Sequence, residues 1–141
     1  MQRKASAVWK GGLKDGKGTI SAPGGALNNT QYSFTSRFES GAGTNPEELI
    51  AAAHAACFSM ALSVQLGEAK LTPESISTNV TLSFDKLDTG WTITESHLDV
   101  VGKVPGADAA TFQKCAEAAE KGCPVSKVLK AKISMTATLE Q

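Results

Sequence analysis

The feature that most constrains the fold is a long alanine-rich segment near the middle of the chain. Between residues 49 and 62 nearly every position is apolar, so a helix formed here has almost no polar face. Such a helix is typical of one that is buried on all sides. We therefore predict a central helix, rather than a surface helix, over residues 46–66.

Strong local signals mark the two ends of this helix. Asn45 can cap its start, Pro46 falls at the first helical position, and Glu48 lies three residues after the cap, as in a capping box. Gly67 follows immediately after the apolar periodicity and is predicted to lie just beyond the C-terminal end.

The segment before this helix is predicted to form three strands within residues 5–38. Residues 32–38 alternate well and form the predicted third strand, in which Arg37 shares one face with Ser33 and Thr35. Glycine-rich turns separate the runs. The expected local structure is therefore a meander.

The segment after the helix mixes strands and shorter helices. A short helix is predicted at 73–76, strands at 79–84 and 90–103, a helix from the Asp108 cap to about residue 121, a short helix at 124–131, and a last strand at 133–139. Because strands and helices segregate rather than alternate, we predict an α+β fold with an antiparallel sheet.

Composition restricts the class of protein. The 141 residues suit a single domain over 1–141. Lys+Arg and Asp+Glu number 14 each, so no basic excess indicates nucleic-acid binding. The best apolar run, residues 51–64, is shorter than the about 20 residues of a spanning helix, and no secretion signal is evident. We expect a soluble, cytoplasmic protein that is bound to neither membrane nor nucleic acid.

Three cysteines are the candidate reactive groups. The count is odd and no CxxC occurs, which argues against a disulfide framework or a zinc ribbon. Cys123 directly precedes Pro124 and so lies at a predicted helix start, where the helix dipole favours a thiolate. Cys57 lies inside the apolar helix and Cys115 inside a later one, as buried structural cysteines often do.

The residues alone leave two interpretations open. Cys57 and Cys123 form a redox pair, or both are packing residues that never meet. Arg37 is a solvated side chain or a cation that lowers the pKa of a thiol. Glu47 compensates the helix dipole, and His54, three residues from Cys57, is more typical of a satisfied core histidine than of a catalytic partner. No metal-ligand spacing is present.

Three motifs occur in order along the chain: Arg37-Phe38-Glu39 with GTNPEEL at 43–49, AAHAACFSMAL at 52–62, and GCPVS at 122–126. With these motifs the chain resembles the OsmC (osmotically inducible protein C) branch of the OsmC/Ohr peroxiredoxin family. The resemblance implies an OsmC-like α+β fold, an intertwined homodimer, and thiol-dependent reduction of organic hydroperoxides, and more weakly of hydrogen peroxide, in oxidative and osmotic stress defence.

The resemblance also implies roles for individual residues. Cys57 corresponds to the peroxidatic cysteine and Cys123 to the resolving one, while Arg37 and Glu47 activate the thiolate and orient the peroxide. The cycle passes through a Cys57 sulfenic acid and a Cys57–Cys123 disulfide. A dithiol such as dihydrolipoamide or a lipoylated protein would reduce that disulfide, and no cofactor or metal is implied. Helix-end electrostatics, in contrast, favours Cys123 as the more acidic thiol.

Helix geometry adds a prediction about assembly. Glu47 and Cys57 are ten residues apart on one predicted helix, a rise of about 15 Å. If both serve one site, Glu47 comes from a second chain or acts through a kink. We therefore predict a symmetric homodimer with sites between subunits. The alternatives to an enzyme are a non-enzymatic redox sensor or binding module, and a structural protein with inert cysteines.

Overall fold

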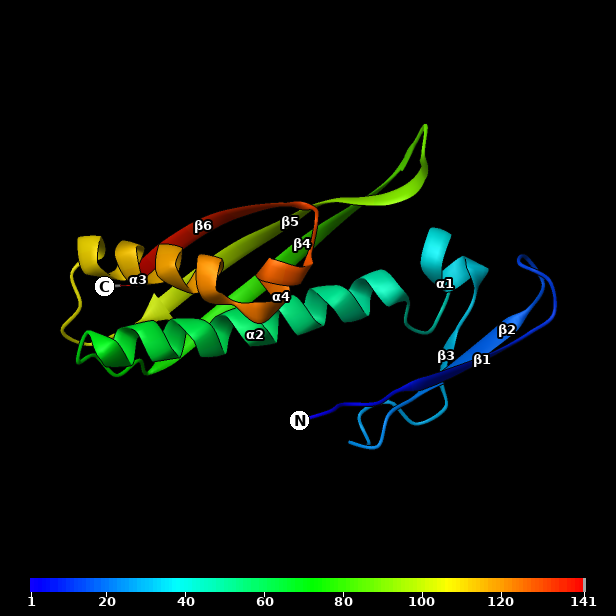
Figure 1. Ribbon diagram of the computed structural model, residues 1–141, viewed down its shortest axis with the longest axis horizontal. Coiled ribbons are helices and arrows are strands. Elements are labelled where there is room, and N and C mark those ends of the chain that lie inside the picture. The colour runs from blue at the N-terminus through cyan, green and yellow to red at the C-terminus, as the bar shows by residue number, and fades with distance from the viewer. Residues whose placement is uncertain (141) are drawn as a thin grey trace. The chain divides into compact units, whose positions relative to one another are not determined.

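The computed structural model describes residues 1–140 and has the predicted α+β composition (Figure 1). The chain forms two compact units, the first comprising Met1–Leu49 and the second beginning at Ile50. Each has its own three-stranded sheet.

The sheet of the first unit is the predicted antiparallel meander. It consists of β1 (Ser6–Lys10), β2 (Lys17–Ser21) and β3 (Thr30–Tyr32). The rings of Trp9 and Tyr32 pack against each other at an interplanar angle of 51°, with centroids 5.5 Å apart. Gly18 of β2 lies against both rings, and a Cβ at this position would overlap them. The glycine therefore allows the aromatic rings to pack directly on the backbone.

The third predicted strand is wrong beyond Tyr32. The strand ends there, and a short helix, α1 (Phe34–Phe38), follows. Ser33 caps this helix: its hydroxyl accepts from the Ser36 N–H at 3.3 Å, and its own N–H donates to the Ser36 hydroxyl at 2.8 Å. This reciprocal capping box stabilises a helical turn despite the alternating side chains. Arg37 therefore lies on a helix and not on a strand face.

The long helix begins where the sequence predicts and extends slightly further. Helix α2 spans Pro46–Glu68, so Gly67 lies inside its last turn. The Asn45 side chain caps the start by accepting from the Glu48 N–H at 2.7 Å. The Glu48 carboxylate does not complete the capping box but accepts from the Thr44 hydroxyl at 2.7 Å.

The sheet of the second unit is mixed rather than antiparallel. Strands β4 (Ser75–Leu87) and β5 (Gly90–Lys103) form an antiparallel hairpin, but β6 (Lys132–Glu140) pairs with β5 in parallel. Helices α3 (Ala109–Gly122) and α4 (Pro124–Val128) lie between β5 and β6 in the sequence. They form a crossover connection, which is what parallel neighbours require.

The short helix predicted at 73–76 does not form. Ser75 and Ile76 instead open β4, paired with Lys103 and Gly102 of β5, and the Glu74 N–H donates to the Lys103 carbonyl at 2.8 Å. The pairing with β5 satisfies backbone groups that an isolated turn of helix would leave open.

The core of the second unit lies between one face of this sheet and helices α2 and α3 (Figure 1). Its side chains belong to α2, β5, α3 and the segments that flank α3: Phe58, Leu62, Leu66, Leu98, Val100, Val104, Phe112, Cys115, Ala116, Ala119 and Cys123. The α2 members recur every four residues, so they form one stripe along the helix.

The other face of α2 is exposed within a single chain. Met60 is 74% exposed and Val64 is 59% exposed. The prediction of burial on all sides is therefore wrong for one chain taken alone. By length and composition α2 could cross a membrane, with a mean hydropathy of 1.7, and its buried stripe packs into the core of the second unit.

Two glycine substitutions test the packing beneath α3. A Cβ at Gly102 of β5 would overlap the ring of Phe112, which is 1% exposed and has no room to move. We expect Gly102→Ala to lower the free energy of unfolding by about 1–3 kcal/mol. The matched control, Gly122→Ala, meets no atom within 4 Å and should raise it by about 0.5–1 kcal/mol. Urea unfolding measures both, and equal effects would contradict this packing.

Candidate active site

The structure brings together the two cysteines that the sequence left as a possible pair. Cys57 lies on α2, and Cys123 lies at the junction of α3 and α4. Their Sγ atoms are 3.1 Å apart, and both are free thiols. Cys57 is half-buried, whereas Cys123 has no exposed surface. The partly open sulfur is therefore the one that a small molecule can reach first.

The start of α4 surrounds Cys123 with hydrogen-bond donors. Cys123 is both the C-cap of α3 and the N-cap of α4, with Pro124 at the first helical position, as predicted. Burial raises the pKa of the Cys123 thiol, but the N–H groups of Ser126 and Val125, the Ser126 hydroxyl and Cys57 outweigh burial and lower the pKa overall. The helix-end argument from the sequence is thus confirmed.

The environment of Cys57 shifts the pKa of its thiol in the opposite direction. Burial, followed by the hydrogen bond with Cys123, raises the pKa of the Cys57 thiol, and the N–H of Val125 offsets these effects only in part. A thiol with a raised pKa is mostly protonated at neutral pH, and the protonated form is a poor nucleophile. Cys57 therefore needs a further positive charge to react efficiently.

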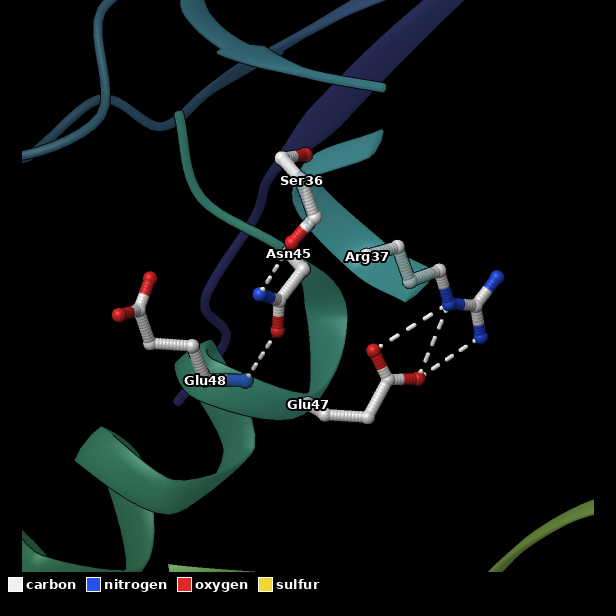
Figure 2. Close-up of polar contacts among 5 residues, drawn as sticks. All are labelled: Ser36, Arg37, Asn45, Glu47 and Glu48. Atoms are coloured by element: carbon white, nitrogen blue, oxygen red, sulfur yellow. Dashed lines mark hydrogen bonds and ion pairs between the residues drawn. The ribbon is translucent and has the colours of Figure 1, made fainter. Parts of the chain in front are cut away.

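The other two predicted site residues also meet. Arg37 of α1 and Glu47 in the first turn of α2 form a forked ion pair (Figure 2), with Nη2–Oε1 at 2.8 Å and Nε at 3.1 and 3.2 Å from the two carboxylate oxygens. The Glu47 side chain is 11% exposed and that of Arg37 is 38% exposed. The carboxylate is thus buried beneath a guanidinium that still reaches solvent.

Asn45 connects the two helices that carry this ion pair. While its side-chain oxygen caps α2, its amide donates to the Ser36 carbonyl of α1 at 2.9 Å (Figure 2). The Ser36 hydroxyl in turn donates to the Thr44 carbonyl at 2.7 Å. These bonds hold α1 against the start of α2, so that Arg37 faces Glu47.

His54 of α2 forms hydrogen bonds that the sequence did not predict. It is fully buried, with Nδ1 at 2.7 Å from the Ser96 hydroxyl and Nε2 at 2.7 Å from the Ser126 hydroxyl. Burial lowers the pKa of the imidazole, so the ring is neutral at neutral pH. The interpretation as a satisfied core histidine is confirmed. The only local signal for the second contact was the serine that lies three residues after Cys123.

Cys115 lies apart from this chemistry. It is 8% exposed, belongs to the core, and its Sγ donates to the Gln65 carbonyl at 3.6 Å. Burial raises the pKa of its thiol, which makes it a poor nucleophile. Among residues 1–140, no group of three or more histidine, cysteine or acidic side chains could hold a metal ion.

An α+β fold that holds two reduced thiols in contact, one of them at a helix N-terminus, defines a cysteine-based redox protein. Comparison with known proteins identifies the family. Residues 39–138 match the OsmC-like protein family. Peroxiredoxin OsmC of Escherichia coli (strain K12) is 54% identical over 135 residues, which cover 96% of this chain and 94% of that protein. The chain belongs to the OsmC-like family.

More distant relatives and solved structures agree. The organic hydroperoxide resistance protein of Xanthomonas axonopodis pv. citri is 34% identical, covering 70% of this chain and 68% of that protein. The crystal structure of the organic hydroperoxide resistance protein OhrB of Bacillus subtilis matches 97% of this chain and 98% of that chain, with a TM-score of 0.68 and 28% identity. The OsmC-like protein of Mycoplasma pneumoniae, 18% identical, covers 100% and 99% with a TM-score of 0.78, which supports the fold.

The buried histidine makes a prediction about stability and pH. In the unfolded chain, His54 becomes protonated below about pH 6.5. In the folded protein, His54 stays neutral until the pH falls to its lower pKa. Folding stability contributed by neutral His54 is therefore lost as pH falls through this window, with a slope of at most about 1.4 kcal/mol per pH unit.

Urea unfolding between pH 7.5 and 5 measures this loss. We expect His54→Gln to show a flatter dependence of unfolding free energy on pH than the wild type, because glutamine does not titrate. An unchanged slope in His54→Gln would show that His54 does not contribute.

Proposed function

We propose that this protein is a peroxidase that uses Cys57 and Cys123 to reduce organic hydroperoxides, and hydrogen peroxide more weakly, in oxidative and osmotic stress defence. The observation that carries the proposal is the 3.1 Å contact between the two free thiols. The names of the relatives, a peroxiredoxin and organic hydroperoxide resistance proteins, support the substrate class.

The first step takes place at Cys57, the more accessible of the two sulfurs. Its thiolate attacks the terminal peroxide oxygen, the O–O bond breaks, and the alkoxide leaves and takes up a proton as the alcohol. Sulfur is oxidised by two electrons to a sulfenic acid, and the peroxide is reduced by two.

The second step uses Cys123. Its thiolate attacks the sulfenic sulfur of Cys57, the S–O bond breaks, and the disulfide forms while the oxygen departs as hydroxide, which takes up a proton from solvent to give water. A disulfide is about 2.05 Å long, so the two sulfurs need to approach by only about 1 Å from their present contact. The lowered pKa of Cys123 provides the nucleophile without a separate base.

Arg37 and Glu47 supply the charge that Cys57 lacks. In this proposal the Arg37 guanidinium stabilises the Cys57 thiolate and orients the peroxide, while Glu47 holds the guanidinium in place by the forked pair.

The helix geometry supports a second chain as the source of this charge. Because α2 is a single helix, ten residues separate Glu47 from Cys57 by about 15 Å. We therefore propose an intertwined homodimer of one OsmC-like domain over 1–141, in which Arg37 and Glu47 of one chain face Cys57 of the other. The exposed side of α2, with Met60 and Val64, provides an apolar surface for such an interface.

The remaining components follow from the chemistry. A Cys57–Cys123 disulfide requires two electrons per turnover, which a dithiol such as dihydrolipoamide or a lipoylated protein can supply by thiol–disulfide exchange. The cycle needs neither cofactor nor metal. Because such a dithiol is kept reduced in the cytosol, we propose a cytoplasmic location.

Cysteine variants test the division of roles. We expect Cys57→Ser to lose turnover of cumene hydroperoxide with a dithiol, by about a thousandfold or more, because no other sulfur forms the sulfenic acid. Cys123→Ser should consume one equivalent of peroxide and accumulate Cys57 sulfenate, seen by mass spectrometry after trapping.

Cys115→Ser is the matched control and should keep wild-type turnover, because its sulfur lies in the core. Oxidation that yields the Cys57–Cys123 disulfide once, without dithiol-dependent turnover, would instead favour a redox sensor or binding module. Labelling of Cys123 before Cys57 by a small alkylating reagent would reverse the two roles.

Mixing two inactive variants tests the shared site. We expect Arg37→Ala and Cys57→Ser each to be nearly inactive as homodimers. After the two are unfolded and refolded together in equal amounts, one site in each mixed dimer combines an intact Arg37 with an intact Cys57. Random pairing then restores about one quarter of wild-type activity.

If Arg37 instead acts on Cys57 of its own chain, no mixed dimer contains an intact site and the activity stays near zero. Refolding each variant separately before mixing is the control for recovery, and sedimentation of an active monomer would also contradict the proposal.

A further inference from the structure

A buried polar network joins the sheet of the second unit to the first turn of α4. Ser96 of β5, His54 of α2 and Ser126 of α4 are connected through the two ring nitrogens of the histidine, each at 2.7 Å from a hydroxyl. Ser96 and His54 are fully buried. Ser96 and His54 take no part in the chemistry described above, and Ser126 lies three residues after Cys123, in the first turn of the helix that Cys123 caps.

The neutral imidazole determines which groups of this network donate hydrogen bonds and which accept them. It carries one hydrogen, so one ring nitrogen donates and the other accepts. If Nε2 carries the hydrogen, it donates to the Ser126 oxygen, and the Ser126 hydroxyl hydrogen is left for another acceptor. If Nδ1 carries it, Nε2 must accept the Ser126 hydrogen, and nothing remains for Cys123.

We propose that Ser96, His54 and Ser126 form a positioning relay for Cys123, in which His54 carries its hydrogen on Nε2 so that the Ser126 hydroxyl donates to the Cys123 sulfur. The Ser96 hydroxyl then donates to Nδ1 and fixes the tautomer. His54 and Ser126 are positioning residues, because they act on the reaction only through Cys123.

The relay has a consequence for the second step of the cycle, and this part rests on the proposed function. A thiolate that accepts a hydrogen bond is stabilised, so the relay keeps more of Cys123 ionised at neutral pH. Ionised Cys123 closes the disulfide before a second peroxide reaches the Cys57 sulfenic acid. That competing reaction would transfer another oxygen to sulfur, giving the sulfinic acid and a second alcohol.

The first test needs no peroxide. In a Cys57→Ser, Cys115→Ser background Cys123 is the only thiol, and its ionisation can be followed by the ultraviolet absorbance of the thiolate. We expect Ser126→Ala to raise the pKa of Cys123 enough to reduce the thiolate fraction by about three- to tenfold below the midpoint. Ser126→Thr keeps a hydroxyl and should restore the wild-type titration.

The matched control is Ser134→Ala. Ser134 also lies 2.7 Å from a histidine nitrogen, Nδ1 of His97, but in the pairing of β5 with β6 rather than beside the thiols. The titration of Cys123 should be unchanged in this variant. An unchanged titration in Ser126→Ala, or an equal shift in Ser134→Ala, would overturn the relay.

The second test follows the reaction in the protein with all its cysteines. After one equivalent of cumene hydroperoxide, Ser126→Ala should form sulfenate at the wild-type rate but close the disulfide about three- to tenfold more slowly at neutral pH. Excess peroxide should give more Cys57 sulfinic acid. The two rates should converge as the pH rises, once Cys123 is ionised in both proteins. Slowing by the same factor at every pH would mean displacement of α4 rather than loss of the donor.

A direct observation is available on the wild type. Nitrogen-15 NMR of the reduced protein distinguishes the two histidine tautomers, and we expect Nε2–H at His54; Nδ1–H would refute the relay even if a variant failed to fold. Absence of any Cys57–Cys123 disulfide after peroxide would refute the proposed function, while the titration and the tautomer would still decide the relay.

Discussion

The packing of one stripe of α2 onto the sheet of the second unit is the constraint on which the thiol site depends. His54, Phe58 and Leu62 recur at four-residue spacing and are all fully buried, so the helix cannot rotate about its axis without exposing them. Cys57 precedes Phe58 by one residue and is thereby held at the edge of the core. The same packing brings the α3–α4 junction, with Cys123, into contact with its sulfur.

The two sulfurs share a contact but not an environment. Cys57 lies on the side of a helix, where burial raises its pKa, and it retains access to solvent. Cys123 is inaccessible but lies at a helix N-terminus, where donors lower its pKa. The sulfur that can meet a substrate is thus the one that needs an external cation, and the sulfur that ionises easily is shielded from substrate. This asymmetry suits a sequence of two attacks at different sulfurs.

Local signals correctly predicted the elements whose ends are marked by capping or turn residues. The Asn45-Pro46 start of α2 and the Asp108 cap of α3 both form as expected. The errors arose where two signals competed. At Ser33 a capping box prevailed over alternation, and at Ser75 pairing with β5 prevailed over a helical turn. The parallel placement of β6 depends on how α3 and α4 return the chain, which no local pattern encodes.

The sequence by itself determined most of the elements, among them the central apolar helix. It also determined the candidate residues and, through the resemblance of its motifs, the family, because caps, periodicity and motif spacing are properties of neighbouring residues. Only the tertiary structure decided that Cys57 contacts Cys123, which is 66 residues away in the sequence. The same holds for the forked ion pair between Arg37 and Glu47 and for the hydrogen bond between His54 and Ser126. Such contacts arise when helices and strands distant in sequence pack against one another. Their geometry is set by the shape of the whole core, which no short stretch of residues contains.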